Sequence, residues 1–384
     1  MLYGFNLAVV NSPAVHIKAF YNATWYQRYG QGLAQGPLTL MYSLTVSIFA
    51  LGGFVGSFPV GILVTQYGSV VPMYLGEIAP KNLRGFLGLV PSIFICLGIF
   101  SAQVLGLPEL LGEDAYWPLF LSVVVVPAFL QLLLLNWFPE SPRYLLIEKN
   151  NVHGAAEALS LFLGQHNVQD TIAEIEEEKR SLASVKAVSV WQLLSDHSVR
   201  LQVLSVVVIN MGMQLSGIDA IWFYTNAIFA NAGIPDPDIP YTTVGTGAIE
   251  VVAGLIGCFT IEKVGRRSLL VVGFCFMGIC CAGITLSLVL QSSVSWMHYI
   301  SVAFVIGIIA GFCMGPAGVP FLMTAELFKQ SHRPSAYIVG GSLNWLSNFT
   351  VGFVFPFLQM IKLNGYGALE NSSLEFSGSG SNLP

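Results

Sequence analysis

The chain has 384 residues, of which 54% are hydrophobic and only 10% are charged. A soluble protein carries roughly 25% charged residues, so this composition excludes an ordinary soluble domain and indicates a protein that crosses the bilayer several times. The net charge of −5 is small for this length and gives no reason to expect nucleic-acid binding. The six cysteines lie in apolar stretches, where we expect them to behave as small buried hydrophobic residues, and the six histidines are scattered. The sequence therefore predicts no disulfide framework, no metal site and no cofactor.

Nine apolar stretches follow one another along the chain, which predicts an all-α polytopic membrane protein. The first is short and resembles a helix whose beginning is missing. The stretches cover residues 2–15, 38–67, 86–107, 117–137, 201–229, 242–261, 269–291, 299–323 and 335–359.

Residues 139–199 interrupt this pattern with a polar composition and helical periodicity around Ala155–Leu163 and Thr171–Glu178. We interpret them as a cytosolic helical insert between an N-terminal helix bundle, residues 1–138, and a C-terminal helix bundle, residues 200–359. Residues 360–384 end in GSGSNLP and are predicted to form a flexible tail.

The distribution of Lys and Arg predicts the orientation of the chain. Most of them lie in segments that face one side of the membrane if the apolar stretches cross it in turn, and the positive-inside bias makes that side cytosolic. The intervening loops carry acidic residues instead. This orientation places the glycosylation acceptor Asn22-Ala23-Thr24 outside, although such a tripeptide also occurs by chance.

One junction in the sequence does not fit a regular succession of spans. The stretch ending at Gly68 arrives in the cytosol, and residues 69–78 are too short to cross again before the basic KNLRG. Both sides of the junction must therefore be cytosolic, so an even number of spans could be absent between Gly68 and Ser69.

The stretch from Asn210 to Asn226 is the most polar of the apolar runs. Asn210, Gln214 and Gly217 share one helical face, while Asp219, Trp222 and Asn226 share another. Glycine between these sets allows the helix to loosen, as the broken helices of transporters do. The stretch is interpreted as the lining of a site for a polar substrate. The alternative is a polar contact between helices inside a bundle.

Six motifs in a fixed order resemble those of the facilitative hexose transporters, in the sugar-porter group of the major facilitator superfamily. They are PMYLGEIAPKNLRG at 72–85, FPESPRYL at 138–145, QLSG at 214–217, EKVGRR at 262–267, GPAGVP with AELF and RPSA at 315–336, and NWLSNF at 344–349. The resemblance implies an incomplete major facilitator fold of about nine of twelve helices. Helix three and most of helix four are absent at the Gly68–Ser69 junction, and helix twelve is absent from the end.

Within that family the chain resembles the fructose-transporter-like class, and most of all its urate-transporting branch. The resemblance also implies a site for the substrate. Its candidate residues are Gln214, Asp219, Trp222, Glu250, Asn344 and Trp345. The site also departs from the family pattern. Met213 and Ser92 stand where the family has glutamines, Asp219 and Glu250 where it has amides, and Phe321 where it has a tryptophan.

Charged residues at the cytosolic ends of the spans are expected to form a network that holds an inward gate shut. Simple anchoring of helices at the interface is the alternative, which explains the arginines but not the paired glutamates. The candidates are Glu77, Arg84, Glu140, Arg143, Glu262, Arg266, Arg267, Glu326 and Arg333.

The resemblance implies a uniporter for hexose, fructose ahead of glucose, that works by alternating access at the plasma membrane and is not an enzyme. Urate is the second substrate hypothesis. A transport-inactive isoform that associates with full-length transporter, or is retained in the endoplasmic reticulum, is a third interpretation. Proton coupling through Asp219 and Glu250 is a fourth.

Overall fold

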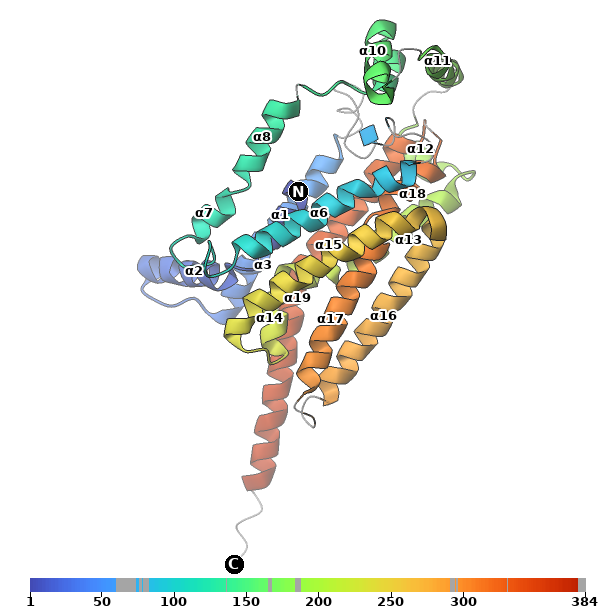
Figure 1. Ribbon diagram of the computed structural model, residues 1–384. Helices are drawn as coiled ribbons and strands as arrows, with labels where there is room; N and C mark the ends of the chain where they lie inside the picture. Colours follow the sequence, from blue (N-terminus) through green and yellow to red (C-terminus); the bar gives the residue numbers. More distant parts are fainter. Residues whose placement is uncertain are drawn as a thin grey trace, which may run out of the picture.

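The regular elements of the computed structural model are all helices in the part that it describes (Figure 1). That part comprises residues 1–59, 74–75, 78, 83–135, 137–164, 168–183, 188–290, 294, 296–329 and 331–378. Eight helical segments within it are long and apolar enough to cross a membrane. Eight of the nine predicted stretches thus correspond to such a segment, and the predicted Gly68–Ser69 junction lies outside the described residues.

The N-terminal half contains six described helices. They are α1 (Leu2–Ala8), α2 (Ala14–Tyr29), α3 (Gln35–Ser57), α6 (Arg84–Leu105), α7 (Trp117–Ser122) and α8 (Val125–Leu135). The predicted span over residues 2–15 is wrong as a single helix, because α1 has seven residues and a turn separates it from α2. Pro13 stands at the start of α2, and its ring disfavours a helical conformation in the residue before it.

Helix α8 stands apart from the other membrane helices in Figure 1. None of its residues is buried, and only 6% of the segment from Trp117 to Leu135 is buried inside the molecule. The comparable figure for Tyr299–Leu327 is 56%. Among the described residues, this span of the N-terminal half therefore has few packing neighbours.

The predicted insert forms four helices, α9 (Pro142–Ile147), α10 (Val152–Leu163), α11 (Gln169–Ala183) and α12 (Val190–Ser195). Side chains cap three of them: Ser141, Asn151 and Ser189 each accept a hydrogen bond from a backbone N–H of the first turn. Helices α9, α10 and α11 share a small core of their own. Leu193 of α12 packs instead with Val206, Phe328 and Ala336, which attaches the end of the insert to the C-terminal half.

The C-terminal half contains seven α-helices and one short 3-10 helix. They are α13 (Arg200–Leu215), α14 (Ile218–Asn231), η1 (Asp236–Asp238), α15 (Ile239–Val264), α16 (Arg266–Leu290), α17 (Met297–Met314), α18 (Val319–Leu327) and α19 (Arg333–Gly378). Helices α13 and α14 form one span that breaks at Gly217, whose φ is +89°. Residues with a Cβ rarely adopt this conformation, which confirms glycine as the breaking point.

Helix α19 continues to Gly378, so the prediction that a flexible tail begins at residue 360 is corrected for its first part. No proline interrupts the chain between Pro356 and Pro384, so nothing in the covalent structure forces the helix to end earlier. Residues 379–384 lie outside the described part.

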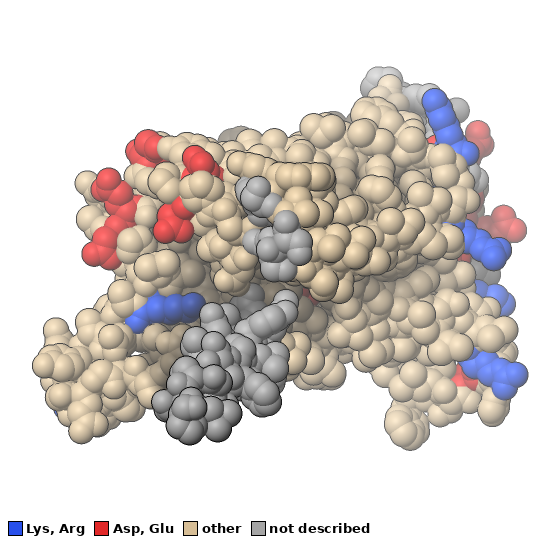
Figure 2. Space-filling view, turned by 90° about the horizontal axis from the view of Figure 1, so that it is seen from below, with Lys and Arg blue, Asp and Glu red and all other residues tan. Residues whose placement is uncertain are grey.

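The two halves meet along pairs of helices, α3 with α19 and α6 with α15. Glycine allows the close approach of α3, since a Cβ on Gly53 would stand 2.3 Å from the Trp345 indole. Ser57 and Ser342 join the same two helices through a 2.8 Å hydrogen bond. On the face drawn in Figure 2, most Lys and Arg lie at one end together with some acidic residues, while the other end carries a group of acidic side chains. The gathering of Lys and Arg at one end agrees with the orientation predicted from the sequence.

Candidate functional site

A cavity of about 230 Å³ lies between the two halves. Its walls come from α1 and α6 of the N-terminal half on one side, and from α13, α14, α17, α18 and α19 of the C-terminal half on the other. They are mostly apolar, with a few polar groups, as is usual for small-molecule sites. The lining residues are Tyr3, Gly88, Pro91, Ser92, Ile95, Cys96, Met213, Trp222, Phe312, Cys313, Ala317, Gly318, Phe321, Gly341, Asn344 and Trp345.

Two aromatic groups give this cavity its shape. Trp345 packs edge-on against Tyr3 and Phe49, with ring centroids 5.4 Å and 5.5 Å apart. Trp222 packs edge-on against Phe312 at 5.3 Å. Each indole thus belongs to a packed aromatic pair, which fixes its position at the cavity wall.

Behind the wall, a buried polar cluster surrounds Asp219, which is fully buried. Asn348 donates a 2.8 Å hydrogen bond to its carboxylate. With the Gln214 amide nitrogen facing Asp219, Gln214 donates to both carboxylate oxygens, at 3.0 Å and 2.6 Å, and its oxygen accepts from Asn344. Amide donors thus stabilise a carboxylate that would be costly in an apolar span without partners. The cluster connects the broken helix α13–α14 with α19, and Asn344 extends it to the cavity.

Glu250 forms a second buried polar contact. Its Oε1 accepts a hydrogen bond from the Trp222 indole N–H at 2.5 Å, which ties α14 to α15. Its Oε2 has no hydrogen-bond partner among the described residues. Trp222 stands at the cavity wall, so Glu250 acts on the cavity through it.

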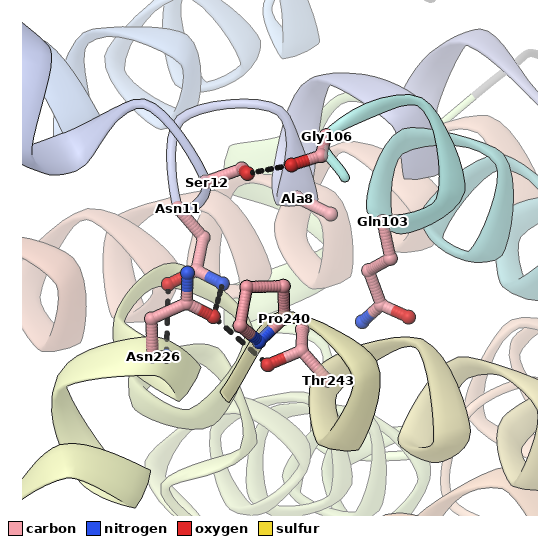
Figure 3. Close-up of a pocket in the computed structure, with 8 residues that line it drawn as sticks. All are labelled: Ala8, Asn11, Ser12, Gln103, Gly106, Asn226, Pro240 and Thr243. Atoms are coloured by element: carbon pink, nitrogen blue, oxygen red, sulfur yellow. Dashed lines mark hydrogen bonds between the residues drawn. The ribbon is translucent and has the colours of Figure 1, made fainter. Parts of the chain in front are cut away.

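A polar junction connects the halves at the far end of α14 (Figure 3). Asn11 Nδ2 donates to Asn226 Oδ1 at 3.0 Å, and Asn11 Oδ1 accepts from the Asn226 backbone N–H at 3.2 Å. Thr243 of α15 donates to the same Asn226 oxygen at 2.8 Å. Gln103 points into the pocket beside this group, whose volume of about 10 Å³ is that of a single water. Asn226, predicted to share a face with Asp219 and Trp222, therefore faces the N-terminal half.

Three of the residues predicted to form a cytosolic charge network meet around Arg266. Its guanidinium lies 3.3 Å from Glu262 Oε2 and 3.1 Å from Glu326 Oε1, so it joins the ends of α15, α16 and α18. Arg333 donates instead to the Phe328 carbonyl at 3.0 Å. These contacts join parts of the C-terminal half to one another.

Among the other predicted gate residues, Arg143 lies in α9. Arg267 is exposed and shows no ion pair within the described residues. Glu140 acts with burial to raise the pKa of Tyr74, whose hydroxyl donates to the Pro139 carbonyl. Glu77 lies outside the described residues. The structure describes the backbone of Arg84 but not its side chain.

A further contact at the cytosolic side joins Asp196 to His332, at 3.8 Å. Hydrogen bonds from Ser198 hold the pKa of Asp196 below its usual range, and the His332 charge adds to this effect. This pair links the insert to the loop before α19.

Of the six predicted substrate residues, Trp222, Asn344 and Trp345 line the cavity. Gln214, Asp219 and Glu250 lie directly behind it and bond to residues of that wall or of α19. Asn348 was missed as an individual residue, although it belongs to the NWLSNF motif. Tyr3 and the cysteine pair Cys96–Cys313 were missed because an aromatic or a cysteine in an apolar stretch carries no polar signal.

Comparison with protein families identifies one match that covers most of the chain. The family described as "Sugar (and other) transporter" matches residues 1–69 and 68–368. The two matched segments meet at the predicted Gly68–Ser69 junction.

Several curated proteins are similar over nearly the whole chain. Human solute carrier family 2, facilitated glucose transporter member 9 is 45% identical over 93% of this chain and 75% of its own length. Human member 5 is 44% identical over 93% of this chain and 80% of its own length. The alignments run over 404 and 403 positions, more than this chain contains, so these relatives carry residues without a counterpart here.

Solved structures of the xylose transporter XylE from E. coli are similar in fold. The structure of the proton:xylose symporter bound to 6-bromo-6-deoxy-D-glucose superposes with a TM-score of 0.75 at 18% identity. It covers 95% of this chain and 87% of the symporter. At this identity the similarity establishes the major facilitator fold.

Proposed function

The chain belongs to the family of sugar transporters, and on that premise we propose that it carries a hexose, fructose ahead of glucose, by facilitated diffusion across the plasma membrane. The observation that carries this proposal is the cavity between the halves, walled by Trp222, Asn344 and Trp345 and supported from behind by Gln214. Members of this family are transporters and not enzymes, so the chemistry of the site is recognition rather than reaction.

The wall offers the two kinds of contact that a sugar requires. The indole rings of Trp222 and Trp345 present apolar faces for the C–H side of a pyranose or furanose ring. Asn344 and Ser92 present an amide and a hydroxyl, which exchange hydrogen bonds with sugar hydroxyls. Gln214 holds Asn344 in place, so the amide is oriented before the sugar arrives.

In alternating access, the two halves move against each other so that the cavity opens to one side of the membrane and then to the other. The cavity lies where the two halves meet, and the helix that borders it is broken at Gly217, as in other transporters with discontinuous helices. On one side of the cavity the halves are joined through Asn11 and Asn226. Opening towards that side requires these hydrogen bonds to separate, and closing re-forms them.

Urate is the second substrate hypothesis, and Asp219 bears on it. A carboxylate beside the cavity repels an anion such as urate unless the carboxylate is neutral. Because Asp219 is fully buried among amide groups, its ionisation decides between the two substrates. Asp219 and Glu250 also raise the alternative that a proton moves with the substrate.

The experiment is uptake into liposomes that contain the purified chain, with labelled fructose, glucose and urate supplied in turn. We expect saturable fructose uptake that an imposed pH gradient does not drive. Gln214→Ala should reduce uptake by an amount equivalent to about 1–3 kcal/mol, because it removes the hydrogen bonds of Gln214 to Asn344 and Asp219. Asp219→Asn should shift the ratio of urate to fructose uptake and flatten its pH dependence.

Two outcomes would overturn parts of this proposal. Uptake driven by a pH gradient would replace facilitated diffusion with proton coupling. Unchanged uptake by Gln214→Ala at equal protein content would remove Gln214 from the site.

A transport-inactive isoform is the alternative that a specific observation favours, namely the exposure of α8. If the purified chain is folded but moves none of the three substrates, this alternative replaces the first. Association with a full-length relative would then be tested by co-purification of two differently tagged chains.

A further inference from the structure

Two cysteine side chains meet across the junction of the halves. Cys96 lies on α6 of the N-terminal half and Cys313 on α17 of the C-terminal half, 217 residues apart in sequence. Their sulfur atoms are 3.9 Å apart. Both are free cysteines, and both line the cavity described above.

The separation of the two sulfurs matches that of two ligands on one metal ion. A tetrahedral Zn²⁺ with Zn–S bonds of about 2.3 Å holds its sulfur ligands about 3.8 Å apart. A disulfide would need the sulfurs to approach to about 2.05 Å. The sulfur–sulfur distance therefore fits two ligands of one cation and is too long for a disulfide bond.

From this geometry we propose that Cys96 and Cys313 form a binding site for a thiophilic divalent cation, such as Zn²⁺ or Cd²⁺, and that the bound ion ties the two halves together. Thiolates are soft ligands and select ions of this class over Mg²⁺ or Ca²⁺. The cavity of about 230 Å³ gives the ion a route to the thiols.

The remaining coordination positions are filled from the surroundings of the pair. No group of three metal-binding side chains is already arranged as a site in the described part of the chain. Water in the cavity therefore completes the coordination shell around the two sulfur ligands.

Binding requires no oxidant. One cation replaces the protons of two thiols, so that two metal–sulfur bonds form, two S–H bonds break and two protons pass to solvent. Binding accordingly strengthens as the pH rises.

The consequence for transport depends on the proposed function. Alternating access moves one half against the other, so α6 and α17 must change their relative position. A cation held by one thiol from each half opposes that movement, and transport stops until a chelator removes it.

The first test measures binding alone, with the purified full chain in detergent and Cd²⁺ as the probe. Cadmium–thiolate bonds absorb in the ultraviolet, and this absorbance should saturate at one Cd²⁺ per chain and grow stronger between pH 6 and pH 8. Cys96→Ser and Cys313→Ser should each weaken binding at least tenfold. Cys275→Ser and Cys281→Ser are matched controls, because these cysteines are exposed on α16 and are not among the residues that line the cavity.

Each variant is compared at equal monodispersity in size-exclusion chromatography, and Cys96→Ala and Cys313→Ala replace any serine variant that aggregates. Binding that survives both Cys96 and Cys313 substitutions, or that falls equally in the controls, would overturn the site.

The second test measures uptake in liposomes with and without Cd²⁺. We expect Cd²⁺ to stop uptake by the wild type, a chelator to restore it, and whatever uptake Cys96→Ser retains to be insensitive to Cd²⁺. Cd²⁺ binding that leaves wild-type uptake unchanged would overturn the tie between the halves. A chain that binds Cd²⁺ but transports nothing supports the site while contradicting the proposed function, so the two failures are distinguishable.

Discussion

Two apolar spans of this protein have opposite environments. The segment Trp117–Leu135 is 6% buried, whereas the segment Tyr299–Leu327 is 56% buried, although both are apolar enough to cross a membrane. The difference lies in the neighbours. Helix α17 packs against α15 and α16, while α8 has no such partner in the described part of the chain. An apolar composition allows a helix to insert into the membrane, whereas small residues and polar partners determine whether it packs against other helices there.

Glycine illustrates how the buried span acquires its contacts. A Cβ on Gly273 would stand 2.6 Å from Pro316, and one on Gly311 would stand 2.8 Å from Phe276. These glycines let α16 approach α17 and the chain beyond it. The sequence of α8, VVPAFLQLLLL, contains no glycine, and its bulky side chains suit contact with lipid.

The largest expected effect comes from giving α8 its missing neighbours. The two spans that the family resemblance implies are absent, taken from a full-length relative and inserted between Gly68 and Ser69, should raise the half-life and surface abundance several-fold, because α8 and its neighbours would then pack against protein. Pulse-chase labelling and surface biotinylation measure both quantities.

The same pair of helices inserted after Gly378 serves as the control for added length. Equal gains from both insertions would show that the junction is not the cause. Normal half-life and surface delivery of the unmodified chain would contradict the prediction of retention in the endoplasmic reticulum.

A pair of core and surface substitutions sharpens the contrast between the spans. Ile309→Ala in α17 removes a side chain that is 1% exposed and should cost about 2–5 kcal/mol of stability. Leu132→Ala in α8 removes one that is 69% exposed and should change stability by less than about 0.5 kcal/mol. Denaturation of the purified variants in detergent measures both. Similar losses in the two variants would mean that α8 is packed after all.

Two glycines in the C-terminal half should respond to alanine with opposite signs. Gly217→Ala should cost about 1–2 kcal/mol, because φ is +89° at the helix break. Gly245→Ala should gain about 0.5–1 kcal/mol, because Gly245 is helical and an added Cβ meets no atom within 4 Å. The same denaturation assay applies, and a gain at Gly217 would contradict the need for a left-handed residue there.

The smallest effect on stability is expected from the sugar attachment site. Asn22 is exposed in α2, and the charge distribution places it outside. A glycosidase should therefore shift the electrophoretic band of the wild type but not that of Asn22→Gln. The Asn22 side chain also accepts a 2.8 Å hydrogen bond from the Leu33 N–H, so glutamine, which keeps the amide group, is chosen as the replacement. An unshifted wild-type band would argue against this orientation or against maturation of the chain.

Most of the fold could be predicted from the sequence because a membrane span needs a long apolar stretch, which is a local property. The break at Gly217 and the helices of the insert were predicted for the same reason. The first span was wrong because a single Asn-Ser-Pro turn at Asn11 outweighs an apolar composition.

The partners in the site could not be predicted in the same way. The polarity of Gln214 and Asp219 was visible, and the resemblance indicated Asn344. That Asp219 bonds Asn348, 129 residues away, depends on how α14 and α19 pack. The charges of Arg266 and Glu326 were predicted as part of a network, but that these two side chains meet each other depends on how α16 and α18 pack.

Helix α14 has a consequence for the kinetics of the whole protein. Its residues Asp219, Trp222 and Asn226 bond to three separate partners, Asn348 on α19, Glu250 on α15 and Asn11 in the N-terminal half. A rotation of α14 by one residue position, about 100°, would carry all three away from their partners together. Because the three bonds would be lost together, we expect α14 to leave this position in one step, and a single-molecule record of its position should show abrupt steps instead of gradual drift.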